Sequence, residues 1–144
     1  MDSNDTNTLI NGLLVEVHRS LLQYTAEAAP WSSDADEELL AQVMEFAAKQ
    51  ESSIEAIVNF LQSRKVLIDF GVYPQEYTSL HFVSLEYLLS RLKESEQTLL
   101  SELKNALGDL VGDEEATSLV QATVQQEQDI LDFLSKATLA SHSS

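Results

Sequence analysis

The stretch that decides the fold is Lys49-Gln50-Glu51-Ser52-Ser53-Ile54, which returns in related form as Gln125-Gln126-Glu127-Gln128-Asp129-Ile130. Each copy lies in the middle of a long segment with helical periodicity, and each places a carboxylate among apolar neighbours. Aligning the two copies also brings Glu37-Glu38 onto Asp113-Glu114. This correspondence indicates a duplicated helical hairpin, and the alternative is a chance similarity between two amphipathic helices.

Apolar residues spaced by three and four positions predict two helices in the first half of the chain. The first runs over residues 9–28 and is stopped by Pro30, because the residue before a proline is pushed out of the helical conformation. The second is capped by Asp34 or Ser33 and continues to about Arg64. Because the connection between them is short, we expect an antiparallel hairpin.

A segment of different character follows at residues 65–79. It begins with the β-like run Val66-Leu67-Ile68, but it also contains Gly71 and Pro74. A single strand has nothing to pair with in a helical protein, so we expect an extended crossover that lies along the helices. Fifteen extended residues at roughly 3.3 Å each span about 50 Å. That reach lets the third helix run parallel to the second.

The second half of the chain predicts another hairpin. Its first helix starts near Thr78 or Ser79 and ends at Gly108, a residue type that favours helix C-termini. After a tight turn, Asp113 caps a last helix that extends toward Leu139. The predicted fold is therefore all-α, a four-helix bundle of two antiparallel hairpins joined by a long crossover. We expect one domain over residues 1–144, with its core at about 8–138.

Composition restricts the function classes. The chain has 24 acidic and 8 basic residues, a formal charge of −16, which disfavours binding to nucleic acid or to anionic membranes. A cation or a basic protein suits this charge, and solubility alone is the other explanation. The chain has no cysteine, so disulfides and thiolate metal sites are excluded. No apolar run approaches the roughly 20 residues of a membrane span, so we expect a cytoplasmic protein.

Several ionisable residues fall on or near the apolar faces of the predicted helices. Burying such groups costs several kcal/mol each unless something compensates them. Carboxylates joined by one imidazole suit iron or manganese, so the sharpest hypothesis is a metal ion or pair in the middle of the bundle. The alternatives are shared protons, hydrogen bonds from Gln50, Gln126 or Arg91, and a dimer interface. The candidate ligands are Glu51, Glu96, Glu127, His18, Glu16 and Glu94.

With two antiparallel helix pairs, a long crossover and paired central glutamates, the chain resembles the ferritin-like superfamily over residues 8 to 138. In the di-iron members, two helices each carry Glu-x-x-His and the other two each supply a glutamate. Glu51 and Glu127 match the motif glutamates, whereas Ile54 and Ile130 stand where the histidines belong. The other two ligand positions match either Glu16 or His18, and either Glu94 or Glu96. The resemblance thus implies the architecture with an incomplete di-iron site.

Two functional hypotheses follow. The first is a non-catalytic bundle that acts by binding or assembly, as a homodimer or with a basic protein partner. The second is a metal-binding or redox protein that uses the mid-bundle carboxylates. No catalytic residue is predicted, since the chain has neither a nucleophile elbow nor a glycine-rich phosphate loop. Trp31, Phe70, Tyr73 and Tyr77 are expected to cover the bundle ends and the crossover, and exposed aromatic residues there would indicate a partner surface.

Overall fold

The computed structural model describes residues 3–28, 37–75, 77 and 85–137 of the 144-residue chain. Its helices are α1 (Ser3–His18), α2 (Leu21–Ala28), α3 (Glu37–Ser63), α4 (Leu85–Asp109) and α5 (Glu114–Lys136). Within these ranges the chain forms no strand. The predicted all-α class is confirmed, as is a four-helix arrangement in which α1 and α2 together make up the first arm.

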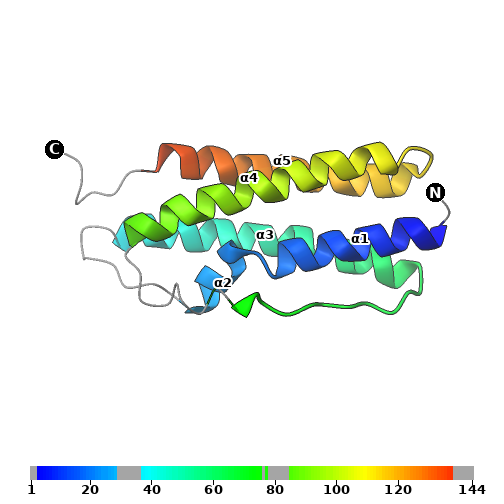
Figure 1. Ribbon diagram of the computed structural model, residues 1–144, viewed down its shortest axis with the longest axis horizontal. Coiled ribbons are helices and arrows are strands. Elements are labelled where there is room, and N and C mark those ends of the chain that lie inside the picture. Colours follow the sequence, from blue (N-terminus) through cyan, green and yellow to red (C-terminus); the bar gives the residue numbers. More distant parts are fainter. Residues whose placement is uncertain (1–2, 29–36, 76, 78–84, 138–144) are drawn as a thin grey trace.

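The helices form two antiparallel pairs (Figure 1). α1 runs antiparallel to α3, and α4 runs antiparallel to α5, while α3 and α4 run in the same direction. Both α1 and α5 contact α3 and α4, which places α3 and α4 at diagonally opposite corners of the bundle. A connection between parallel, diagonal helices must travel the length of the bundle, and the segment after α3 does so.

This crossover follows α1 in an extended conformation (Figure 1). The Asn11 side chain donates to the carbonyl of Asp69 (2.8 Å) and accepts from its amide (3.0 Å). Arg19 Nε donates to the carbonyls of Phe70 (3.2 Å) and Gly71 (3.1 Å). Gly71 has a φ of +69°, and an added Cβ would lie 2.5 Å from a methyl carbon of Val15. Glycine therefore lets the crossover lie directly on α1.

The first arm is broken at Arg19 and Ser20, where a single helix was predicted over residues 9–28. The amide of Ser20 bonds the carbonyl of Val17 (3.3 Å), which tightens the last turn of α1. The hydroxyl of Ser20 then accepts from the amide of Gln23 (3.4 Å) and caps α2. A serine side chain that bonds nearby backbone offers the chain an alternative to a continuous helix.

α1 begins at Ser3, six residues before the start predicted at residue 9, and the ends of α3, α4 and α5 can be compared with prediction one by one. α3 ends at Ser63, next to the predicted Arg64. Asp113 caps α5 as predicted, because its side chain accepts from the amide of Ala116 (3.0 Å). Gly108 was predicted to end α4, but the helix continues to Asp109. Gly112, with a φ of +100°, supplies the left-handed turn instead. The predictions for Pro30, Trp31, Ser33, Asp34, Thr78, Ser79 and Leu139 lie outside the described residues.

Two apolar clusters fill the bundle, and a buried polar layer separates them. One cluster contains Leu14 and Leu103, and the other contains Leu22 and Leu92. In each of the four arms of the bundle (α1 with α2, α3, α4 and α5), a buried polar residue stands between the residues of one cluster and those of the other. The buried residues of this polar layer are Ser20, Gln23, Gln50, Glu96 and Glu127. Among the described residues, no helix is long and apolar enough to cross a membrane.

Candidate functional site

Gln50 is the centre of the polar layer and is completely buried. Its side-chain nitrogen donates to both carboxyl oxygens of Glu127, at 2.8 and 3.0 Å, and to Glu96 Oε1 at 3.3 Å. Its side-chain oxygen accepts from the Ser20 hydroxyl and from Gln23 Nε2, both at 3.0 Å. The amide thus presents its donors to two carboxyl groups and its acceptor to α2, and this network fixes its orientation.

Burial is the largest cause of a raised pKa in both carboxyl groups. The pKa of Glu96 is raised to about 10, first by burial, then by the nearby charge of Glu127, and then by their hydrogen bond. Burial also raises the pKa of Glu127, although hydrogen bonds from Glu96 and Gln50 oppose the rise. Glu96 Oε2 is buried and receives no hydrogen bond, so this carboxyl group lacks the donors that an ionised form needs. At neutral pH Glu96 therefore carries the proton.

In the polar layer the structure brings together two of the six candidate ligands. Glu96 and Glu127 meet in the polar layer, and Gln50, which was predicted as one alternative partner, bonds both. The expectation that Glu51 is buried is wrong, because its side chain is exposed to solvent. One residue along a helix turns the side chain by about 100°. Gln50 therefore faces the interior and Glu51 faces outward.

The other three candidates lie away from the polar layer. The side chains of Glu16 and Glu94 are exposed. His18 is half-buried, and its ring packs edge-on against Phe70 with 5.8 Å between ring centroids. The geometry therefore separates a buried carboxyl pair from the peripheral residues that sequence spacing had grouped with it.

The polar layer does not provide the ligands of a metal pair. Across the ranges that the structure describes, no three His, Asp or Glu side chains are arranged to hold a metal ion. The third side chain of the layer, Gln50, turns its NH₂ group toward Glu96 and Glu127, and its oxygen is occupied by Ser20 and Gln23. An amide nitrogen is a hydrogen-bond donor and not a metal ligand. This donor set does not fit an iron or manganese pair.

Sequence reasoning missed the residues on the first arm. Ser20 and Gln23 have the Ser-x-x-Gln spacing of a capping box, which is the signal that could have located the start of α2. In the structure the amide of Gln23 bonds Ser20 as in that motif. The Gln23 side chain turns inward instead and donates to the carbonyl of Ala47 (2.8 Å) and to Gln50. The break in the first arm thus supplies two hydrogen-bond donors to the polar layer.

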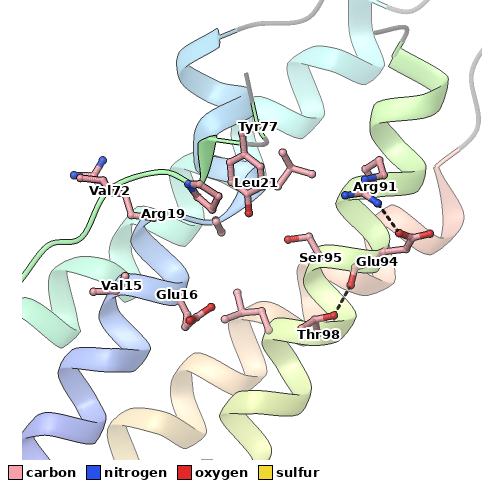
Figure 2. Close-up of a pocket in the computed structure, with 13 residues that line it drawn as sticks. Val15, Glu16, Arg19, Leu21, Val72, Tyr77, Arg91, Glu94, Ser95 and Thr98 are labelled. Atoms are coloured by element: carbon pink, nitrogen blue, oxygen red, sulfur yellow. Dashed lines mark hydrogen bonds and ion pairs between the residues drawn. The ribbon is translucent and has the colours of Figure 1, made fainter. Parts of the chain in front are cut away.

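A separate hollow lies at the junction of α1, α2, the crossover and α4 (Figure 2). Glu16 and Glu94 both line it, and so does Ser20.

A scan against protein-family models, a search of curated proteins and a search of solved structures each found no match to this chain.

Proposed function

We propose that the protein is a ferritin-like four-helix bundle in which a proton-sharing polar layer replaces the metal centre. On this proposal it acts by binding or assembly and not by catalysis. The observation that supports it is the position of the Gln50 amide, which donates to Glu96 and Glu127 from within 3.3 Å. A hydrogen-bond donor there fulfils the role that a cation has between the carboxylates of di-iron bundles.

The ligand pattern of the superfamily supports the same proposal. On α3 the inward position holds Gln50, and the residue three positions later is Ser53 in place of histidine. On α5 Glu127 is retained, but Ile130 is fully buried where the second histidine belongs. On α4 Glu96 is retained. Two carboxylates and no imidazole remain at this level of the bundle, and two carboxyl groups in one buried site strongly raise the pKa of one of them.

An assembly role is supported by the crossover. Leu67 and Val72 are 99% and 83% exposed, and Phe70 is also exposed. Three exposed apolar side chains on one short segment are unusual for a surface that faces only water. Their neighbours Val66 and Ile68 pack on the core, so the segment is held in place while its outer side chains remain accessible. We propose that a second copy of the chain covers this surface.

Metal analysis of protein purified without chelator tests the absence of a metal centre. We expect well under one equivalent of iron, manganese or zinc, with no rise in the melting temperature when each metal is added. Stoichiometric metal, together with a rise in melting temperature that Glu127→Gln removes, would contradict this part of the proposal. The matched control is Glu55→Gln, which replaces an exposed glutamate on α3 and should leave any metal-dependent rise unchanged.

Sedimentation equilibrium tests the assembly part. We expect the wild-type chain to dimerise, and we expect a Leu67→Ser, Val72→Ser double variant to remain monomeric. Val111→Ser is the control, since Val111 is 85% exposed but lies in the turn before α5. Because apolar contacts are insensitive to screening, the dimer should persist at high salt. A monomer at every concentration, or a dimer that survives the double substitution, would refute assembly through the crossover.

A further inference from the structure

The first part of the crossover, residues 66–70, is an extended segment that lies on α1 (Figure 1). Side chains alternate along it. Val66 and Ile68 pack on the core, whereas Leu67 is 99% exposed and Asp69 is also exposed. Alternation of buried and exposed side chains is the pattern of a β-strand with one solvated face. The segment therefore has the form of a single β-strand at the surface of a helical bundle.

One edge of this strand is unpaired. The amide and the carbonyl of Asp69 both bond the Asn11 side chain on α1. Neighbouring residues of an extended chain direct their backbone groups to opposite edges, so those of Ile68 point away from Asn11. Within the part of the chain that the structure describes, neither backbone group of Ile68 has a hydrogen-bond partner. A strand edge with free N–H and C=O groups is a template for pairing with another strand.

Lys65, at the start of the strand, stands at a position that favours glycine. Its amide bonds the carbonyl of Gln62 (3.0 Å), and the amide of Val66 bonds the carbonyl of Leu61 (3.3 Å), which is the Schellman motif of a helix end. The φ of Lys65 is +58°, a conformation that strains a side-chain-bearing residue. Lys65 is exposed and forms no ion pair with any described residue. A lysine kept at a strained, exposed position indicates a contact outside the single chain.

The sequence Lys65-Val66-Leu67-Ile68-Asp69 is complementary to itself when two copies run antiparallel. With Leu67 opposite Leu67, Lys65 of each copy lies opposite Asp69 of the other. Asp69, like Lys65, forms no ion pair in the described ranges. Opposite charges directly across two antiparallel strands are favourable, and like charges there are unfavourable. Any other antiparallel register moves Lys65 away from Asp69.

We propose that two copies of the chain pair antiparallel through this strand, about a two-fold axis at Leu67. This inference rests on the proposed assembly through the crossover and specifies how the two copies meet. The amide of Ile68 donates to the carbonyl of Val66 of the second copy, and the two-fold axis repeats the bond. The two Leu67 side chains then form a non-hydrogen-bonded pair, the kind in which the side chains of opposite residues lie closest.

Two charge-reversal variants test this register when they are mixed. In its own homodimer Lys65→Glu puts a second negative charge opposite Asp69, and Asp69→Lys puts a second positive charge opposite Lys65. In a heterodimer of the two variants, both cross-strand pairs have opposite charges. We expect each homodimer to be weakened about tenfold and the heterodimer to dominate the mixture, as measured by native mass spectrometry and sedimentation equilibrium.

The preference for the heterodimer is independent of effects within one copy. Asp69→Lys removes the bond from the Gly71 amide to the Asp69 carboxylate (2.9 Å), but it does so whichever copy it pairs with. Only complementary charges across the interface make the heterodimer stronger than the mean of the two homodimers. The matched control is a mixture of Lys104→Glu with Asp109→Lys, at exposed sites on α4, which should pair at random.

Lys65→Gly separates the interaction of this lysine from its effect on folding. Because glycine adopts a φ of +58° without strain, the variant should unfold at no lower temperature than the wild type, at a concentration where both are monomeric. Its dimer should nevertheless be several-fold weaker, since the charge opposite Asp69 is lost. A dimer of unchanged affinity would overturn the pairing of Lys65 with Asp69.

A disulfide locates the two-fold axis. The chain has no cysteine, so a single introduced cysteine can bond only the same residue of a second copy. Leu67→Cys should form this bond readily under mild oxidation, because only residues near the axis meet their own equivalents. Val72→Cys is the control on the same surface, since Val72 is 83% exposed but lies beyond Gly71, away from the axis. It should crosslink at least tenfold more slowly.

The outcomes distinguish this inference from the assembly role on which it rests. A wild-type chain that is monomeric at every concentration refutes both. If Leu67→Ser with Val72→Ser abolishes the dimer, assembly through the crossover is supported. The antiparallel register about Leu67 is then overturned if the charge-reversal variants mix at random, or if Leu67→Cys crosslinks no faster than Val72→Cys.

Discussion

Glu96 on α4 and Glu127 on α5 both bond the side-chain nitrogen of Gln50, at 3.3 Å and 2.8 Å, in the buried layer between the two apolar clusters. Two carboxyl groups this close cannot both ionise in a buried site without a large electrostatic cost. The bundle therefore retains a proton that the unfolded chain would release at neutral pH. Folding and proton binding are consequently linked.

The first prediction concerns the pH dependence of stability. The pKa of Glu96 is 4.5 in the unfolded reference and about 10 in the folded protein. A raised pKa stabilises the fold fully below about pH 4.5, and this contribution declines as the pH rises toward 10. For one proton the limiting slope is about 1.4 kcal/mol per pH unit. Urea denaturation at several pH values should show this decline between about pH 5 and pH 9.

Glu96→Gln is the matched variant because glutamine resembles the protonated carboxyl group and does not titrate. The difference in unfolding free energy between wild type and this variant should fall as the pH rises. Unfolding of the wild type at neutral pH should also release about one proton, which calorimetry in buffers of different ionisation enthalpy measures. A pH-independent difference, or unfolding without proton release, would show that Glu96 is ionised in the fold.

The second prediction concerns Gln50. Gln50→Leu removes the donors to Glu127 and the acceptor for Ser20 and Gln23, so several buried polar groups lose their partners. We expect the free energy of unfolding to fall by about 3 kcal/mol, measured by urea denaturation. Gln62→Leu on the exposed face of α3 is the control and should change stability by less than about 0.5 kcal/mol. Equal effects of the two substitutions would mean that the polar layer does not stabilise the fold.

The sequence predicted the helices well because their periodicity and caps are local signals. It did not identify Gln50, because the stripe through Val43, Ala47 and Ile54 is compatible with either Gln50 or Glu51 on the inside. Spacings of three and four are equally helical, so periodicity alone cannot choose between adjacent residues. The choice depends on Glu96 and Glu127, which lie on helices far away in the sequence.

The break in the first arm was missed for a related reason. No proline or glycine marks Arg19 and Ser20, and the apolar stripe continues through them. The break becomes favourable only in the folded bundle, where the Ser20 hydroxyl bonds Gln50 and Arg19 binds the crossover. Local propensity yields to tertiary contacts at such positions.

The third prediction concerns the contact between the crossover and α1. Gly71→Ala places a methyl group 2.5 Å from a Val15 methyl carbon, at a φ of +69° that alanine disfavours. We expect a loss of about 2 kcal/mol in the free energy of unfolding. Gly108→Ala is the control, because Gly108 lies within α4 and an added Cβ meets nothing within 4 Å. That substitution should stabilise the protein by up to about 1 kcal/mol.

Hydrogen exchange distinguishes a local from a global effect of Gly71→Ala. The Asp69 amide bonds Asn11, and we expect its protection to fall more than that of amides in α4. A tolerated Gly71→Ala, with unchanged protection of Asp69, would show that the crossover does not need this close approach to α1.

The last prediction separates the two roles of Asp113. One carboxyl oxygen caps α5 through the amide of Ala116, and both oxygens bond Arg64, at 2.8 and 2.9 Å. Asp113→Asn retains a capping oxygen but loses the charge, whereas Asp113→Ala loses both. Since the ion pair is partly exposed, we expect a loss of up to about 1 kcal/mol for asparagine and about 2 kcal/mol for alanine.

Acid titration provides the check on this assignment. Hydrogen bonds from Arg64 and from the amide of Ala116 lower the pKa of Asp113 below its ordinary value of 3.8. A lowered pKa stabilises the fold above that ordinary value, and the contribution disappears as the pH falls through the folded pKa. The wild type should therefore lose its advantage over Asp113→Asn in acid, as measured by thermal denaturation. An advantage that persists in acid would mean that Asp113 acts through its cap alone, because only the ion pair requires the charge.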